Sequence, residues 1–68
     1  MASPLTQWAM ANLTREERIV INLRHLLRLN FPAIDLILEL PQHRARETYA
    51  RAYALIRDHV LEGLSTDG

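Results

Sequence analysis

Apolar residues along this chain recur at intervals of three and four, and the runs are separated by proline, asparagine and threonine. Such spacing places apolar side chains on one face of an α-helix. No stretch shows the strict alternation of apolar and polar residues that is typical of a half-buried strand. The pattern therefore predicts an all-α fold with four helices and no sheet.

Capping residues mark the start of the first two helices. Ser3 precedes a proline and is expected to cap a helix that reaches about Asn12. Thr14 and Glu17 have the spacing of a capping box, and the helix that they open should extend to about Leu29. An apolar stripe on that second helix is wider than one packed face requires; it consists of Ile19, Val20, Leu23, Leu26 and Leu27. The charged residues of its first turn are expected to be solvated; they are Arg15, Glu16, Glu17 and Arg18.

A third helix should follow Asn30, which can act as its N-cap. We expect it to end at Leu40, because a residue that precedes a proline is pushed out of the α region. Its apolar face would comprise Ile34, Ile37 and Leu38.

The fourth helix should span about Gln42 to Glu62, with Gly63 as its C-cap and 63–68 as a flexible tail. Its core stripe is predicted from steps of three and four residues; the members are Ala45, Tyr49, Ala52, Tyr53, Ile56 and Val60. On the first helix, Leu5, Trp8 and Ala9 should share one packed side.

The 68 residues suffice for one small domain, with its helical core at 13–62. Chains this short usually need a disulfide, a metal or a partner subunit for stability. The sequence has no cysteine, and its three histidines lack the spacing of zinc ligands, so we expect neither metal nor cofactor. Oligomerisation remains, and we predict a homodimer. On the fourth helix, a line of mostly small residues is either the dimer interface or ordinary surface. Trp8 either joins this interface or lies in the core. The candidate dimer-interface residues are therefore Trp8, Ala50, Ala54 and Leu61.

Composition excludes several classes of function. The formal net charge is zero, so no overall charge attracts the chain to nucleic acid or to an anionic membrane. No apolar run approaches the ~20 residues that span a bilayer, and the first residues do not resemble a signal peptide. We therefore expect a cytoplasmic protein. Neither a Ser-His-Asp order nor a glycine-rich phosphate loop occurs, so we expect no enzyme and no small-molecule substrate.

A family resemblance rests on two segments. LTREERIVINLRHLL begins at Leu13 and matches the pattern L-x-x-x-E-R-x-V-x-x-L-R-x-L; RARETYARA begins at Arg44. Between them lie apolar residues at the expected spacing, namely Phe31, Ile34, Ile37 and Leu38. From Leu13 to Val60 the chain thus resembles the fourth region of bacterial sigma factors and, more loosely, the DNA-binding domain of quorum-sensing activators. The resemblance implies a helix-turn-helix, whose second helix lies against DNA.

Three residues depart from the family pattern. Asp35 stands where the family keeps a small residue, and Glu39 stands where the corner usually has glycine. Thr48 replaces an arginine that often contacts phosphate. A carboxylate between packed helices is costly without a partner, so we expect either that the corner is remodelled or that the helices have shifted apart.

Two functions fit this scaffold. The first is a regulator of phage or mobile-element type that binds and inhibits a transcription protein, such as an activator, a sigma factor or RNA polymerase. The second is a homodimeric regulator that binds double-stranded DNA. Either would use the exposed side of the fourth helix and its start; the candidate residues are Gln42, His43, Arg44, Arg46, Glu47 and Arg51. We favour the protein partner, since the altered corner would harm a DNA reader more.

Overall fold

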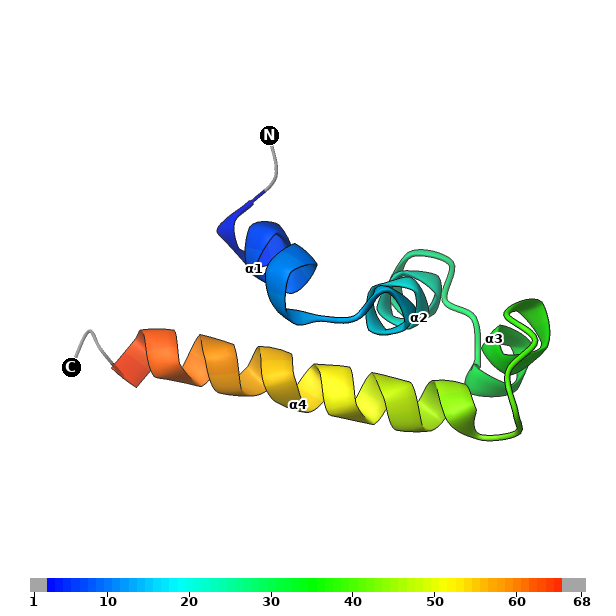
Figure 1. Ribbon diagram of the computed structural model, residues 1–68. Coiled ribbons are helices and arrows are strands. Elements are labelled where there is room, and N and C mark those ends of the chain that lie inside the picture. The colour runs from blue at the N-terminus through cyan, green and yellow to red at the C-terminus, as the bar shows by residue number, and fades with distance from the viewer. Residues whose placement is uncertain (1–2, 66–68) are drawn as a thin grey trace.

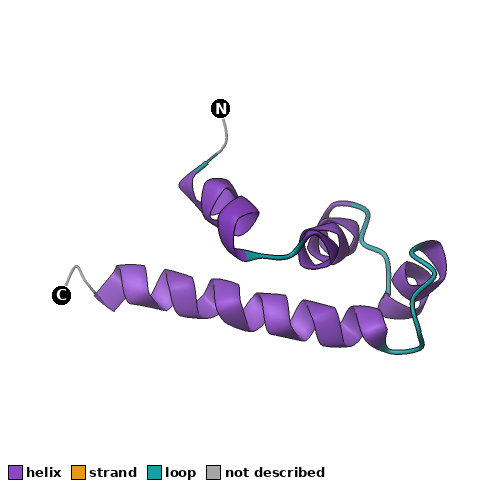
Figure 2. Ribbon diagram, viewed as in Figure 1, coloured by secondary structure: helices purple, strands orange, loops and turns teal. Residues whose placement is uncertain are grey.

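The computed structural model describes residues 3–65, and within this range it contains four α-helices and no strand. The helices are α1 (Pro4–Asn12), α2 (Arg15–Leu26), α3 (Phe31–Ile37) and α4 (Arg44–Ser65). With 22 residues, α4 is about 33 Å long. The three shorter helices lie along one side of it, with α3 near its start and α1 near its end (Figure 1). Short loops join the helices (Figure 2), and the predicted all-α class is confirmed.

The predicted N-caps of the first three helices are confirmed. Ser3 Oγ and Asn30 Oδ1 each accept a hydrogen bond from the backbone N–H three residues on, at 3.1 and 2.9 Å. The capping box of α2 is complete: the Thr14 N–H donates to Glu17 Oε1 at 2.8 Å, and the Glu17 N–H donates to Thr14 Oγ1 at 3.1 Å. Local sequence therefore fixes where these helices begin.

The end of α2 differs from the prediction. The helix ends at Leu26 rather than near Leu29, because Arg28 has a φ of 54° and turns the chain out of the helix. Leu26 and Leu27 consequently project into solvent, with 77% and 64% of their surface exposed. The wide apolar stripe predicted for α2 is therefore only partly packed within the chain.

The end of α3 also comes early. This helix ends at Ile37, and the next turn closes as a Schellman motif. The Leu40 N–H donates to the Asp35 carbonyl at 2.8 Å, and the Glu39 N–H donates to the Leu36 carbonyl at 3.3 Å. Such a motif needs one residue at positive φ, and here it is Glu39, at 56°. The proline was the wrong stop signal, because the turn forms before the chain reaches it.

The bounds of α4 are shifted toward the C-terminus by two or three residues. The helix starts at Arg44, after His43 with a φ of 69°, and continues to Ser65. Gly63 lies inside the helix, so its prediction as a C-cap was wrong, and so was a tail beginning at residue 63. Residues 66–68 of that predicted tail lie outside the described residues.

The core lies where α2, α3 and the first half of α4 meet. Val20, Ile34 and Ala45 are fully buried there. Partly buried apolar side chains surround them; these are Leu23, Leu29, Phe31, Leu38, Leu40 and Tyr49. Ala52 is also buried, whereas α1 contributes no buried side chain.

Several residues predicted for packed faces are exposed. On α4, Tyr53 is 55% and Val60 is 43% exposed, because α2 and α3 cover only the side of the helix that carries Ala45 and Ala52. On the shorter helices, Leu5 and Ile37 are likewise exposed. None of the described helices combines the length and apolarity needed to cross a bilayer.

The first turn of α2 is less solvated than expected. Glu17 is buried, with 6% of its surface exposed, because its carboxylate completes the capping box. The Arg18 guanidinium donates hydrogen bonds to the carbonyl of Leu13 at 2.7 Å and to that of Met10 at 3.2 Å. These two bonds fix the end of α1 to the start of α2.

Candidate partner-binding surface

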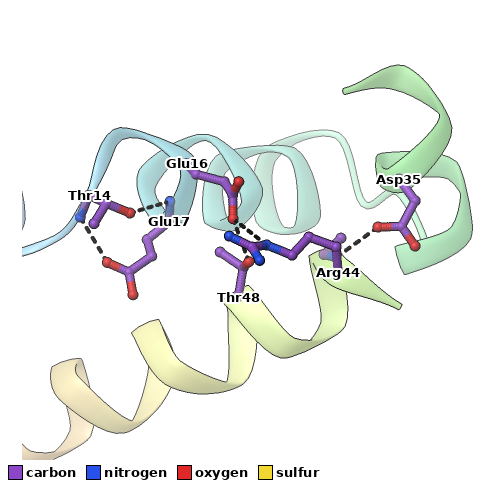
Figure 3. A network of polar contacts seen from close by, with 7 residues as sticks. Thr14, Glu16, Glu17, Asp35, Arg44 and Thr48 are labelled. Carbon is purple, nitrogen blue, oxygen red and sulfur yellow. Dashed lines mark hydrogen bonds and ion pairs between the residues drawn. The ribbon is translucent and has the colours of Figure 1, made fainter. Parts of the chain in front are cut away.

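The corner between α3 and α4 is organised by one carboxylate. Asp35 is almost fully buried, and its side chain points from α3 toward the start of α4 (Figure 3). Its Oδ2 accepts a hydrogen bond from the His43 N–H at 3.0 Å, and its Oδ1 accepts one from the Ala45 N–H at 2.7 Å. These N–H groups lie at the helix start, where they have no partner within the helix. Asp35 therefore caps α4 from the preceding helix.

The buried Asp35 carboxylate has the partners that it requires. The expected cost of burying Asp35 is offset, because both carboxylate oxygens have backbone donors and the positive end of the helix macrodipole lies next to them. Glu39 takes the positive φ that glycine would take more easily. The chain also turns between α3 and α4 and does not continue as one rod (Figure 1). The corner is tight and specifically bonded.

A second polar network joins α2 to α4. Thr48 is fully buried, and its hydroxyl donates to Glu16 Oε2 at 2.7 Å. The same oxygen accepts a hydrogen bond from Arg44 Nε at 3.1 Å (Figure 3). Thr48 thus links two helices, and its hydroxyl is not available to contact phosphate.

These contacts act on the charge of Glu16. The Thr48 hydroxyl and then the Arg44 guanidinium favour the ionised carboxylate, and together they lower the pKa of Glu16 below its ordinary value. Burial of the carboxyl opposes this shift but does not reverse it. Arg44 is therefore occupied within its own chain, although its side chain remains 45% exposed.

The predicted partner-binding residues lie just before α4 and along its first half. All six of them are solvent-exposed; they are Gln42, His43, Arg44, Arg46, Glu47 and Arg51. Among the described residues, no hydrogen bond or ion pair is formed by the side chains of Arg46 and Arg51. Two of the three arginines are therefore available to a partner, and Arg44 is available only in part.

Next to these residues lies a groove that the sequence did not predict. It has a volume of about 440 Å³ and runs between α3 and the start of α4. Apolar side chains form one part of its lining; these are Phe31, Pro32, Leu36 and Leu40. Polar side chains form the other part, namely Asp35, Gln42, His43 and Arg46. Leu36 is 81% exposed, so the groove presents apolar surface directly to solvent.

The residues predicted for a dimer interface differ in exposure. Ala50 and Leu61 are exposed on α4, whereas Ala54 is half-buried and lines a groove beside Thr14 and Glu17. Trp8 is half-buried and stacks on His59, with ring centroids 4.3 Å apart. This stack joins α1 to the second half of α4.

An aromatic and basic cluster was also missed from the sequence. His25 Nε2 lies 3.0 Å from the Tyr49 hydroxyl, and the rings of Phe31 and Tyr53 flank Tyr49 at 5.3 and 6.1 Å. The Arg24 guanidinium lies 5.3 Å from the Phe31 ring centre. The four-residue step between the tyrosines was the one visible signal, since it places both on one side of a helix. The partners from α2 and α3 could be found only from the fold.

Within residues 3–65, no group of three or more histidine, aspartate or glutamate side chains is arranged to hold a metal ion. No protein-family model, no curated protein and no solved structure matches this chain.

Proposed function

We propose that this chain is a small regulator of transcription that binds a transcription protein and modulates or inhibits it. The proposed contact surface is the corner between α3 and α4, read as a degenerate helix-turn-helix. One observation carries the proposal: an apolar groove opens beside exposed arginines at the start of α4. Interfaces between proteins combine apolar anchors with arginine in this way.

The chemistry of the corner favours protein over DNA as the partner. Surfaces that bind DNA are polar and strongly positive. Here Leu36 and Ile37 are 81% and 57% exposed, and both would lie unused against a phosphate backbone. Glu47 is exposed within three residues of both Arg44 and Arg46 and reduces the local positive charge. The sequence resemblance to sigma factors supplies the link to transcription.

DNA binding is the second candidate, and the Asp35 cap favours it. That cap fixes α3 against the start of α4, which is the rigidity that a reading helix needs. Gln42, His43 and Arg46 are exposed at the start of α4, where base edges would lie in such a complex. We also propose a homodimer for either function, because the chain is short and has no cysteine. Two copies would double a weak contact.

Two binding measurements distinguish these candidates. Purified bacterial RNA polymerase holoenzyme and its isolated sigma factor are titrated with the chain, and a random-sequence DNA duplex is titrated over a range of salt concentrations. We expect saturable binding to one of the proteins. Leu36→Ser should weaken this binding. Leu64→Ser, the same substitution at the other end of the molecule, should leave it unchanged. Sedimentation of the same samples reports the oligomeric state.

Steeply salt-dependent DNA binding that Arg46→Ala and Arg51→Ala abolish would instead establish the second candidate. Binding to none of the three targets would contradict the DNA candidate and would leave an activator as the protein partner to be tested.

A further inference from the structure

The groove between α3 and α4 has two chemically different sides. Phe31, Pro32 and Leu36 from α3 and Leu40 from the corner supply the apolar side. Arg46 lies on the opposite side, beside Gln42 and His43. At about 440 Å³ the groove is in the size range of sites that accept a small organic group. It can hold one or two large side chains of a partner.

Arg46 carries an exposed positive charge in the groove, whereas the negative charge of Asp35 is almost fully buried. The Asp35 carboxylate also lines the groove, but both its oxygens already accept hydrogen bonds from the start of α4. The side chain of Arg46 has no hydrogen bond or ion pair within the described residues. An arginine in this situation attracts an anion, and its fork of donors matches a carboxylate.

We propose that the groove binds a protein segment that carries a large apolar side chain next to a carboxylate. The apolar group packs on Phe31, Leu36 and Leu40, and the carboxylate pairs with Arg46. This inference rests on the proposed function, because it names the chemistry of the partner at the same corner. It goes beyond that function by predicting what the groove selects: an apolar anchor paired with an acid.

A small set of matched probes tests this selection. ¹⁵N-labelled protein is titrated with 3-phenylpropionate, with its neutral amide and with 3-phenylpropylamine, and backbone amide shifts are followed by NMR. The carboxylate should shift amides of Leu36, Gln42, His43 and Arg46, with a dissociation constant on the order of millimolar for a ligand of this size. The amide should bind about three- to fivefold more weakly, as expected for loss of an exposed ion pair. The amine should bind weaker still.

Two pairs of variants separate the charge from the apolar surface. Arg46→Gln should weaken the carboxylate about three- to fivefold and leave the amide unchanged, whereas Arg51→Gln, which changes another exposed arginine of α4, should alter neither. Leu36→Ser should weaken both probes, and Leu64→Ser should not. Because Leu36 and Arg46 are exposed, these changes leave the core intact.

Several outcomes would overturn the inference. Equal affinity for the carboxylate and the amide would show that Arg46 does not pair with the carboxylate. Amide shifts confined to other residues would show that the probe does not bind in the groove. If a short DNA duplex shifts the same four amides and 3-phenylpropionate shifts none, the corner binds phosphate and not a carboxylate next to an apolar group. If the probe binds as expected but RNA polymerase and sigma factor do not, the groove stands and the proposed function fails. The reverse result would retain the function and move its contact elsewhere.

Discussion

The two halves of α4 are fixed to the rest of the molecule by different means. The first half packs on α2 and α3 around Val20, Ile34 and Ala45, and carboxylates from both helices bond to it. The second half meets α1, which has no buried side chain, and its main described contact there is the stack of Trp8 on His59. The comparison indicates that tertiary stability is concentrated at one end of a long helix.

The two halves of α4 also differ in how their surface residues are supported. At the first half of α4, polar groups are satisfied and the groove is formed by a fixed framework. At the second half, Val60, Leu61 and Leu64 are 43%, 53% and 65% exposed, so apolar residues there add little to the core. A fixed corner can hold binding residues in place. The second half is instead expected to open locally at lower free energy.

The sharpest test removes the cap of α4. Asp35→Ala leaves two backbone N–H groups without acceptors, one of them on the fully buried Ala45, and should lower the free energy of unfolding by about 3 kcal/mol. A domain of this size has about 3–10 kcal/mol in total, so urea denaturation should show a midpoint at a much lower urea concentration. Asp35→Asn retains one acceptor oxygen and should cost about half as much.

Trp8→Ala is the comparison at the other end of the helix. It removes far more atoms than Asp35→Ala, but it should cost less, about 2 kcal/mol, from the loss of the aromatic pair and of the partly buried area of Trp8. If both variants lose the same stability in urea, α1 is an integral part of the core and the comparison between the two halves is wrong.

Local sequence predicted the starts of the first three helices well, because a cap depends on residues three positions apart. Ser3, Thr14 and Asn30 were assigned correctly for that reason. The end of the first helix at Asn12 was also predicted correctly, but the ends of α2 and α3 were not, because Arg28 and Glu39 take left-handed backbone conformations that their residue types do not indicate. Gly63, which does favour that conformation, lies within a helix.

The candidate site was predicted in part. The exposure of Arg46 and Arg51 followed from helical periodicity, because both fall off the core stripe of α4. The role of Asp35 could not be predicted, since it bonds to residues eight and ten positions away across a turn of unknown path. Thr48 and Glu16 are 32 positions apart, so their contact required the packing of α2 on α4.

The strained turn at the first half of α4 gives a test with the opposite sign. Glu39→Gly should raise the free energy of unfolding by about 1 kcal/mol, because glycine takes the φ of 56° without a clash at Cβ. The same change at Glu47, inside α4, should lower it by about 1 kcal/mol. Thermal unfolding followed by circular dichroism should show shifts of about 4–8 °C in opposite directions. Shifts of the same sign would mean that the turn at Glu39 is not left-handed in solution.

The smallest expected effect concerns the link between α2 and α4, and it depends on pH. Because the Thr48 hydroxyl and Arg44 lower the pKa of Glu16, the ionised carboxylate stabilises the folded state. This contribution is present above the ordinary pKa of 4.5 and is lost as the pH falls through the lower folded value. Glu16→Gln should therefore cost about 0.5 kcal/mol at neutral pH, since the pair is partly exposed.

Urea denaturation of Glu16→Gln and the unmodified chain at several pH values measures that difference. It should shrink as the pH is lowered below 4.5, because the protonated carboxyl and the amide then lack charge alike. Arg44→Gln should reduce the same acid-dependent difference in part, since the Thr48 hydroxyl still donates to Glu16. A difference that stays constant from neutral to acidic pH would show that Glu16 joins the two helices through hydrogen bonds that do not depend on its charge.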